Sequence, residues 1–254
     1  MTYSNRDLRD EIRDYWSDRA ATFDDDPGHH IKDGAEIAAW RNLFRRHLGN
    51  ADGRALLDLA SGTGEIARLC QSMGFVVTGL DWAEPMLERA RDKLPGVTFL
   101  QADAERTTLP AASADVIVTR HLVWTLVNPT SAFAEWFRVL RPGGTLLIVD
   151  GDFVSRSVLG RLIQRLLPSG SHSVGAAANA ARHKDILARV HFSAGARADN
   201  VAALLKGAGY DQIVIDTDLA PIHRAQFAQL GWRKSLLRRS EHRYAISATK
   251  PLDL

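Results

Sequence analysis

The sequence predicts an α/β fold built on a doubly wound, Rossmann-like sheet, and two observations carry this prediction. Between residues 54 and 150, short runs rich in Val, Ile and Leu each end in a polar residue and are followed by a helical pattern. Largely apolar runs are expected when helices cover both faces of a parallel sheet. Two further strand-like runs, at 212–216 and 244–249, lie too close to the C-terminus for another strand-helix-strand crossover, so they are not expected to extend the parallel sheet.

Seven mainly parallel strands follow from this pattern. We expect them at residues 54–59, 75–81, 97–103, 115–120, 145–150, 212–216 and 244–249. The last two are expected to form an antiparallel pair at the edge of the sheet. Pro85 near a helix start and the RPGG turn at 141–144 support the boundaries, because proline is tolerated in a first helical turn and Pro-Gly favours a tight turn.

Helices are expected on both sides of this core. Ser4 is suited to cap a first helix, and a second is indicated by an apolar stripe; we expect both to pack on the open edge of the sheet. The residues that mark these helices are Leu8, Ile12, Tyr15, Trp16 and Arg19, then Ile37, Trp40 and Phe44.

Residues 153–198 break the strand-helix alternation, and we interpret them as an inserted helical lid. An apolar stripe between 158 and 167 is followed by a Ser/Gly-containing loop and an alanine-rich stretch. The expected organisation is an N-terminal helical cap (1–50), a core (51–152), the lid (153–198) and a C-terminal segment that completes the sheet (199–254). Together they form one structural domain.

Composition narrows the classes of function. The 254 residues, 45% of them hydrophobic, are enough to bury a substantial core. A net charge of +2 gives no global field for binding nucleic acid phosphates. The single cysteine, Cys70, is expected to be a small buried hydrophobe. Charged first residues and the lack of a long apolar run predict a cytoplasmic protein with no membrane partner.

A glycine turn after the first strand indicates a ligand. The GTGEIA run at 62–67 fits the dinucleotide pattern G-x-G-x-x-G/A, which requires only that backbone approach a ligand closely. The first three strands end near Asp58, Asp81 and Asp103. Asp81 suits the ribose hydroxyls of a nicotinamide or an adenosyl ligand alike. Asp58 discriminates between these two ligands, since its carboxylate would repel the pyrophosphate of a nicotinamide cofactor and attract the ammonium group of an amino acid. Asp103 offers an acceptor to an adenine amino group, so the ligand that fits is S-adenosylmethionine.

At these positions the sequence resembles the class I S-adenosylmethionine-dependent methyltransferases, in particular the small-molecule branch whose members have a methyltransferase domain of type 11 or 25. The first motif of that family, D-x-G-x-G-x-G, is present as DLASGTG at 58–64, with alanine in place of the first glycine. The RPGG turn also fits the family pattern. The resemblance implies cofactor contacts for the methionine end at Asp58, Ala60, Ser61, Gly62, Gly64 and Arg120, for the ribose at Asp81, and for adenine at Trp82, Met86, Asp103 and Ala104.

Methyl transfer from a sulfonium is an in-line displacement, so the site mainly positions a nucleophile and excludes water. We expect no metal, and a base only when the acceptor carries a proton. His121, which follows the fourth strand, is the leading candidate base, with a structural histidine as the alternative. Residues 15–30 are similar to the cap of small-molecule methyltransferases, in which Tyr15 would shape the pocket. His29 would be a second base or acceptor contact, or else His29 and His30 form an exposed loop pair.

The function these features favour is methylation of oxygen or nitrogen on a small molecule. The lid is rich in arginine and lysine, which either form solvated helix faces or bind an anionic acceptor. One rival is an RNA-modifying methyltransferase, suggested by the basic segment at 233–243, although net charge makes nucleic acid an unfavoured partner. A non-catalytic cofactor-binding protein and a nicotinamide oxidoreductase are further alternatives. Acceptor identity and oligomeric state stay open, with a homodimer as one option.

Overall fold

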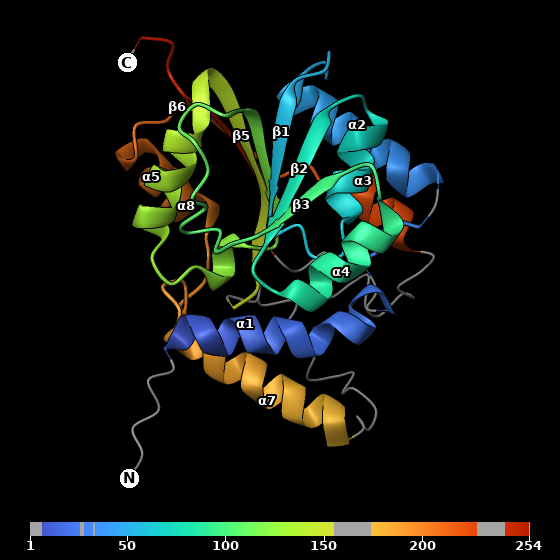
Figure 1. Ribbon diagram of the computed structural model, residues 1–254. Helices are drawn as coiled ribbons and strands as arrows, with labels where there is room; N and C mark the ends of the chain where they lie inside the picture. The colour runs from blue at the N-terminus through green and yellow to red at the C-terminus, as the bar shows by residue number, and fades with distance from the viewer. Residues whose placement is uncertain (1–6, 26–27, 33, 155–173, 228–241, 254) are drawn as a thin grey trace.

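A seven-stranded sheet in the order β3-β2-β1-β4-β5-β7-β6 organises the chain (Figure 1). The structure is a computed structural model that describes residues 7–25, 28–32, 34–154, 174–227 and 242–253. The first five strands are parallel, and β7 is antiparallel to both β5 and β6. The predicted fold and the antiparallel pair at the edge are confirmed. The strands are β1 (Ala55–Leu59), β2 (Val76–Asp81), β3 (Thr98–Gln101), β4 (Ala114–Arg120), β5 (Leu140–Asp152), β6 (Asp211–Asp216) and β7 (His242–Thr249).

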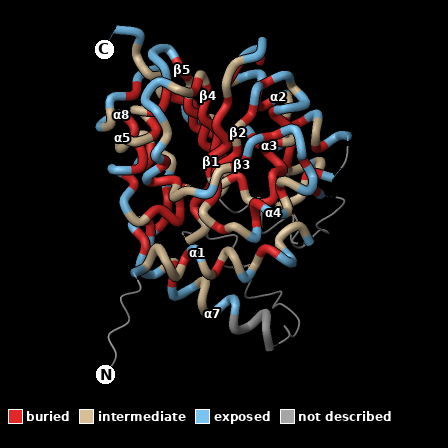
Figure 2. The backbone as a smooth tube through the Cα atoms, in the orientation of Figure 1, coloured by how far each residue is buried: buried red, intermediate tan, exposed pale blue. Residues whose placement is uncertain are grey.

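Helices cover both faces of this sheet, so the central strands are buried on both sides (Figure 2). Neighbouring strand residues point to opposite faces, and Leu56 therefore packs with Phe44 while Leu57 packs in the cluster of Trp136. Cys70 is fully buried in the first cluster, as expected. One face carries α2 (Gly34–Leu48), α3 (Glu65–Ser72) and α4 (Glu84–Lys93); the other carries α5 (Pro129–Val139) and α8 (Ala198–Gly207).

The strand order reverses between β1 and β4, which are neighbours although β2 and β3 come between them in the chain. The register pairs Asp58 of β1 with Gly79 of β2 and with Val118 of β4. The carboxyl ends of these strands therefore lie at one level, at the position where open α/β sheets bind ligands.

Two helical segments lie across the carboxyl ends of the strands: α1 (Leu8–Arg19) with the 3₁₀ turn η1 (Ala20–Asp25), and α7 (Val174–Arg189), which packs along α1 (Figure 1). Ile12 and Tyr15 of α1 form an apolar cluster with Ile186 of α7 and with Val190. Arg182 lies 2.7 Å from Asp18 in an ion pair that joins the two helices. Of the predicted lid, the structure describes α7; the stripe at 158–167 lies outside the described residues.

Two predictions about the N-terminal helices are wrong. The cap of α1 is Asp7, whose carboxylate accepts the Asp10 amide at 3.0 Å, whereas Ser4 lies outside the described residues. Neither helix packs mainly on the open edge as expected. The apolar stripe of α2, with Trp40, needs an apolar partner, and a sheet face provides one whereas a strand edge presents backbone polar groups. The last turn of α2 does reach the edge strand β6, through His47.

Candidate active site

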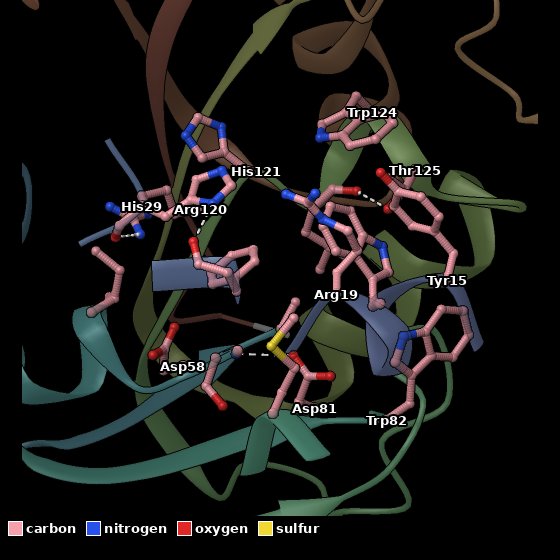
Figure 3. A pocket seen from close by; sticks show the side chains of 18 of the residues that line it. Tyr15, Arg19, His29, Asp58, Asp81, Trp82, Arg120, His121, Trp124 and Thr125 are labelled. Carbon is pink, nitrogen blue, oxygen red and sulfur yellow. Dashed lines mark hydrogen bonds between the residues drawn. The ribbon is translucent and has the colours of Figure 1, made fainter. Parts of the chain in front are cut away.

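A cavity of about 420 Å³ lies between the carboxyl ends of the strands and the helices α1 and α7 (Figure 3). Its volume is in the range of small-molecule and cofactor sites. Asp103 and Ala104 line a smaller adjoining cavity instead, and Gly64 lines neither. The predicted site residues that line the main cavity are Tyr15, His29, Asp58, Ala60, Ser61, Gly62, Asp81, Trp82, Met86, Arg120 and His121.

The glycine turn after β1 is held open by left-handed backbone and by one carboxylate. Ala60, Gly62 and Gly64 have φ values of 55°, 53° and 85°. The Asp81 carboxylate accepts the amides of Gly62 and Ala83, both at 2.9 Å, and so ties this turn to the end of β2. Backbone is thereby brought to the cavity without side chains in the way.

Gly64 has a different role from the other residues of the turn. It is the N-cap of α3, and a Cβ there would lie 3.2 Å from the side chains of Ala90 in α4 and of Leu94 directly after it, so the glycine allows the two helices to approach. Gly64 lines neither cavity, so its position does not favour the predicted contact with the cofactor.

Two ionisable side chains, the buried Asp58 and the half-buried Arg120, face the main cavity (Figure 3). Asp58 Oδ2 and Arg120 Nη1 have no hydrogen-bond partner among the described residues. Arg120 Nη2 donates to the His29 carbonyl at 2.7 Å, and its guanidinium lies over the Trp40 ring. Burial raises the pKa of Asp58 to about 8, against the opposing effect of Arg120. Burial also lowers the pKa of Arg120. Buried charges without partners are costly, so this pair fits the ammonium and carboxylate groups of an amino acid.

The N-terminal cap is anchored directly on this end of the cavity. Asp24 accepts the Thr63 hydroxyl of the glycine turn at 2.6 Å and pairs with Lys93 at 2.6 Å. Arg9 of α1 lies 2.6 Å from Glu105, which also accepts the Val127 amide at 2.6 Å. Cap, turn and the segment after β4 are therefore fixed to one another.

The opposite end of the cavity is aromatic. Tyr15 and Trp16 of α1, Trp124 of the 3₁₀ turn η2 (Val123–Thr125) and Phe153 after β5 line it. Edge-to-face contacts join Tyr15 to Trp16 at 5.0 Å, Trp16 to Trp124 at 6.3 Å and Trp124 to Phe153 at 6.1 Å between ring centroids. Arg19 and Arg243 also line the cavity. These residues can orient a planar molecule and favour one with negative charge.

Three histidines line the cavity in different settings. His121 has a φ of 62°, and its ring lies 5.5 Å from that of Phe153, between the main cavity and a small one behind it. His29 Nδ1 is 3.0 Å from the Phe23 carbonyl, to which it donates, and the two rings stack at 4.1 Å. His30 Nδ1 lies 3.0 Å from Glu65 Oε1, and the His30 side chain is 38% exposed. The alternative of a loop pair without a role in the site stays a prediction. The third histidine, His183 of α7, was not predicted.

Sequence reasoning missed Trp124, Phe153, His183 and Arg243 as cavity residues. They come from four separate segments. Trp124 lies within the TRHLVWTL stretch at 119–126, near His121, and Arg243 ends the basic segment at 233–243, which was singled out only as a possible RNA contact. Two of the lid arginines that the structure describes, Arg182 and Arg189, form ion pairs with Asp18 and Glu11 of α1. The expectation that transfer needs no metal stays a prediction.

Comparisons with known proteins identify the family. A family model described as a methyltransferase domain matches residues 57–148. The demethylmenaquinone methyltransferase of Renibacterium salmoninarum is 31% identical over 163 residues, which cover 59% of this chain and 67% of that protein. The chain belongs to the class I S-adenosylmethionine-dependent methyltransferases. A ubiquinone/menaquinone biosynthesis C-methyltransferase of Marinomonas sp. is 30% identical over 167 residues, 59% of this methyltransferase and 66% of the relative.

Solved structures agree on the fold. The geranyl diphosphate C-methyltransferase of Streptomyces coelicolor A3(2), in complex with Mg²⁺, geranyl-S-thiolodiphosphate and S-adenosylhomocysteine, superposes with a TM-score of 0.62 at 14% identity, covering 98% of this chain and all (100%) of that one. The methyltransferase uses S-adenosylmethionine, and the unpaired atoms of Asp58 and Arg120 suit the amino acid end of that cofactor. None of the helices in the described part of the chain has the length and hydropathy needed to cross a bilayer.

Proposed function

We propose that this methyltransferase transfers a methyl group to oxygen, or to nitrogen, of a small planar molecule bound at the aromatic end of the cavity. The observation that carries the proposal is the division of one cavity into two chemically different ends. Acidic groups and open backbone lie at one end, with Asp58 and Asp81; aromatic rings and a cation lie at the other, with Trp124 and Arg19 (Figure 3). Arg243 lies over the Phe153 ring, 5.2 Å from its centroid.

The cofactor supplies a methyl group on a positively charged sulfur. In our proposal Asp58 and Arg120 hold its amino acid end against the backbone of Ala60, Ser61 and Gly62. The carboxylate of Asp81, besides fixing the turn, accepts the ribose hydroxyls. The adenine would lie beside Trp82 and Met86, with its edge at the adjoining cavity of Asp103 and Ala104.

The acceptor end orients the nucleophile and keeps water out. Rings of Tyr15, Trp16, Trp124 and Phe153 suit an aromatic or other planar acceptor. The helices α1 and α7 form the cap and lid in this proposal, and they limit the cavity to small molecules. Held in this way, an acceptor atom gains rate from proximity and orientation, since the methyl group is already activated.

Cations at the acceptor end favour oxygen over a charged amine. Arg19 and Arg243 would attract an ionisable hydroxyl or another anionic group and repel an ammonium group. Transfer to ring carbon is the second candidate, favoured by the names of the quinone-biosynthesis relatives. Removing a proton from a hydroxylated ring makes both its oxygen and its adjacent carbons nucleophilic, so both outcomes need the same site.

Turnover assays test the proposal. The purified protein, S-adenosylmethionine and a panel of phenols, hydroquinones, carboxylic acids and amines are incubated, and products are identified by mass spectrometry and by NMR of the new methyl group. We expect O-methyl products from hydroxylated rings. Exclusive C-methyl products would move the assignment to the second candidate. Transfer only to RNA, lost at high salt, would contradict the proposal.

A further inference from the structure

We propose that His183, carried into the cavity by the lid helix α7, is the catalytic base that takes the proton from the acceptor hydroxyl. This inference rests on the proposed function, because it concerns an acceptor that carries a proton. It assigns His121 a positioning role instead of the base role predicted from the sequence.

Geometry places the His183 ring among the aromatic residues of the acceptor end. Its centroid lies 5.0 Å from that of Trp124 and 5.8 Å from that of Tyr15, with tilted planes. A planar acceptor that contacts these two rings would therefore also contact the imidazole. The side chain lines the same cavity as Asp58 and Asp81, which lie at the cofactor end.

The imidazole of His183 is available for a proton. No described residue makes a hydrogen bond to it. His29 is held at the Arg120 side of the cavity, where its carbonyl accepts from Arg120 at 2.7 Å and its ring stacks on that of Phe23 at 4.1 Å. His121 has interactions of its own and leans against Phe153, on a backbone with φ of 62° that fixes its direction. Such strained backbone suits a residue that shapes a site.

The surroundings keep His183 neutral, the form that accepts a proton. Burial and the nearby Arg19 of α1 lower the pKa of His183 below its usual value. Other ionisable groups near it are the Tyr15 hydroxyl on α1, and His121 and Arg243 across the cavity. On its own helix, Arg182 is paired with Asp18 of α1.

The chemical step balances with these groups. The acceptor O–H proton moves to a neutral nitrogen of His183 as the acceptor oxygen forms a bond to the methyl carbon. The carbon–sulfur bond breaks, and its electron pair stays on sulfur, which becomes neutral. The imidazolium then releases its proton to water. Arg19 stabilises the developing negative charge on the acceptor oxygen while it opposes the charged imidazolium, so it favours rapid loss of that proton.

The test measures turnover against pH with a phenol that the wild-type protein methylates. His183→Asn is expected to lower kcat about 10²-fold at pH 7, with S-adenosylhomocysteine affinity unchanged. Because phenolate forms without help at high pH, the variant should regain activity as pH rises. With a more acidic phenol, already ionised at pH 7, the loss should shrink to a few-fold. Lys184→Ala, an exposed neighbour on α7, is the matched control and should behave as wild type.

A second measurement separates a base from a merely structural histidine. The low-pH limb of the wild-type profile should follow the pKa of His183 and lie below about 6.5. Arg19→Gln should move that limb to higher pH, since it removes a cation that lowers the His183 pKa, and Arg19→Lys should not. NMR titration of the His183 ring in the full-length wild-type protein with S-adenosylhomocysteine reports the same pKa directly, even where a variant folds poorly.

Three results would overturn the inference. These are equal losses for His183→Asn at every pH and with every phenol, a pH limb that Arg19→Gln does not move, or loss of the limb in His121→Asn alone. In each case methyl transfer by the wild-type protein would leave the proposed function standing. If the wild-type protein methylates no hydroxylated acceptor, this inference fails, and the product assays show separately whether methylation of an amine leaves the proposed function standing.

Discussion

The two ends of the cavity differ in how the chain builds them. The cofactor end comes from turns that directly follow parallel strands, so Asp58, Gly62 and Asp81 lie within 24 residues of sequence. The acceptor end collects Tyr15, Trp124 and other rings from segments far apart in the chain. One end is a local consequence of the fold, whereas the other depends on how the helices α1 and α7 cover the sheet. Changes at each end should therefore affect different measurements.

The largest effect is expected from Asp58→Asn, at the cofactor end. The change removes a buried charge that would pair with the ammonium group, so S-adenosylhomocysteine affinity should fall about 10²-fold or more in calorimetry. The acceptor KM should change little at saturating cofactor. An affinity within about threefold of wild type would contradict the assigned role of Asp58.

The same substitution should stabilise the protein without ligand. Burial raises the pKa of Asp58 to about 8, well above the usual range of an aspartate. The stability contributed by this carboxyl is fully present below its unfolded pKa and is lost as pH rises toward 8. The asparagine amide carries no charge to bury, so thermal melts of Asp58→Asn at pH 8 should show a higher Tm than wild type, with a smaller difference at pH 5. A lower Tm at both pH values would contradict this sign.

A smaller effect is expected from Phe153→Ala, at the acceptor end. Removing this ring takes away part of the aromatic surface beside Trp124, so the acceptor KM should rise about tenfold, a loss in the range of one side-chain contact. Affinity for S-adenosylhomocysteine should stay within about twofold of wild type. Phe153→Leu keeps apolar volume and serves as the matched control, with an intermediate KM.

The smallest effect is expected where the two covering helices meet. Arg182→Gln removes an ion pair with the exposed carboxylate of Asp18, and exposed pairs contribute little. The acceptor KM should rise only about two- to threefold, and 0.5 M salt should produce a similar rise in the wild-type protein. A tenfold change, or a change in cofactor affinity instead, would mean that α7 does more than cover the acceptor end.

The comparison also explains which features the sequence could predict. Strand patterns and turn chemistry are local, so the seven strands and the cavity-lining residues from Asp58 to Met86 could be predicted. The helix packing could not, because the apolar stripe with Trp40 is equally compatible with several partners. His183 carries no local signal, since one histidine in an alanine-rich helix gains a role only where α7 lies against α1.

Calorimetric titration with S-adenosylhomocysteine tests the central claim most directly when wild type, Asp58→Asn and Phe153→Ala are compared, with NADH as the control ligand. We predict saturable binding at one site in the wild-type protein, a loss of about 10²-fold in Asp58→Asn, nearly unchanged affinity in Phe153→Ala, and no binding of NADH. Equal losses in the two variants, or binding of NADH in place of S-adenosylhomocysteine, would contradict the division of the cavity into a cofactor end and an acceptor end.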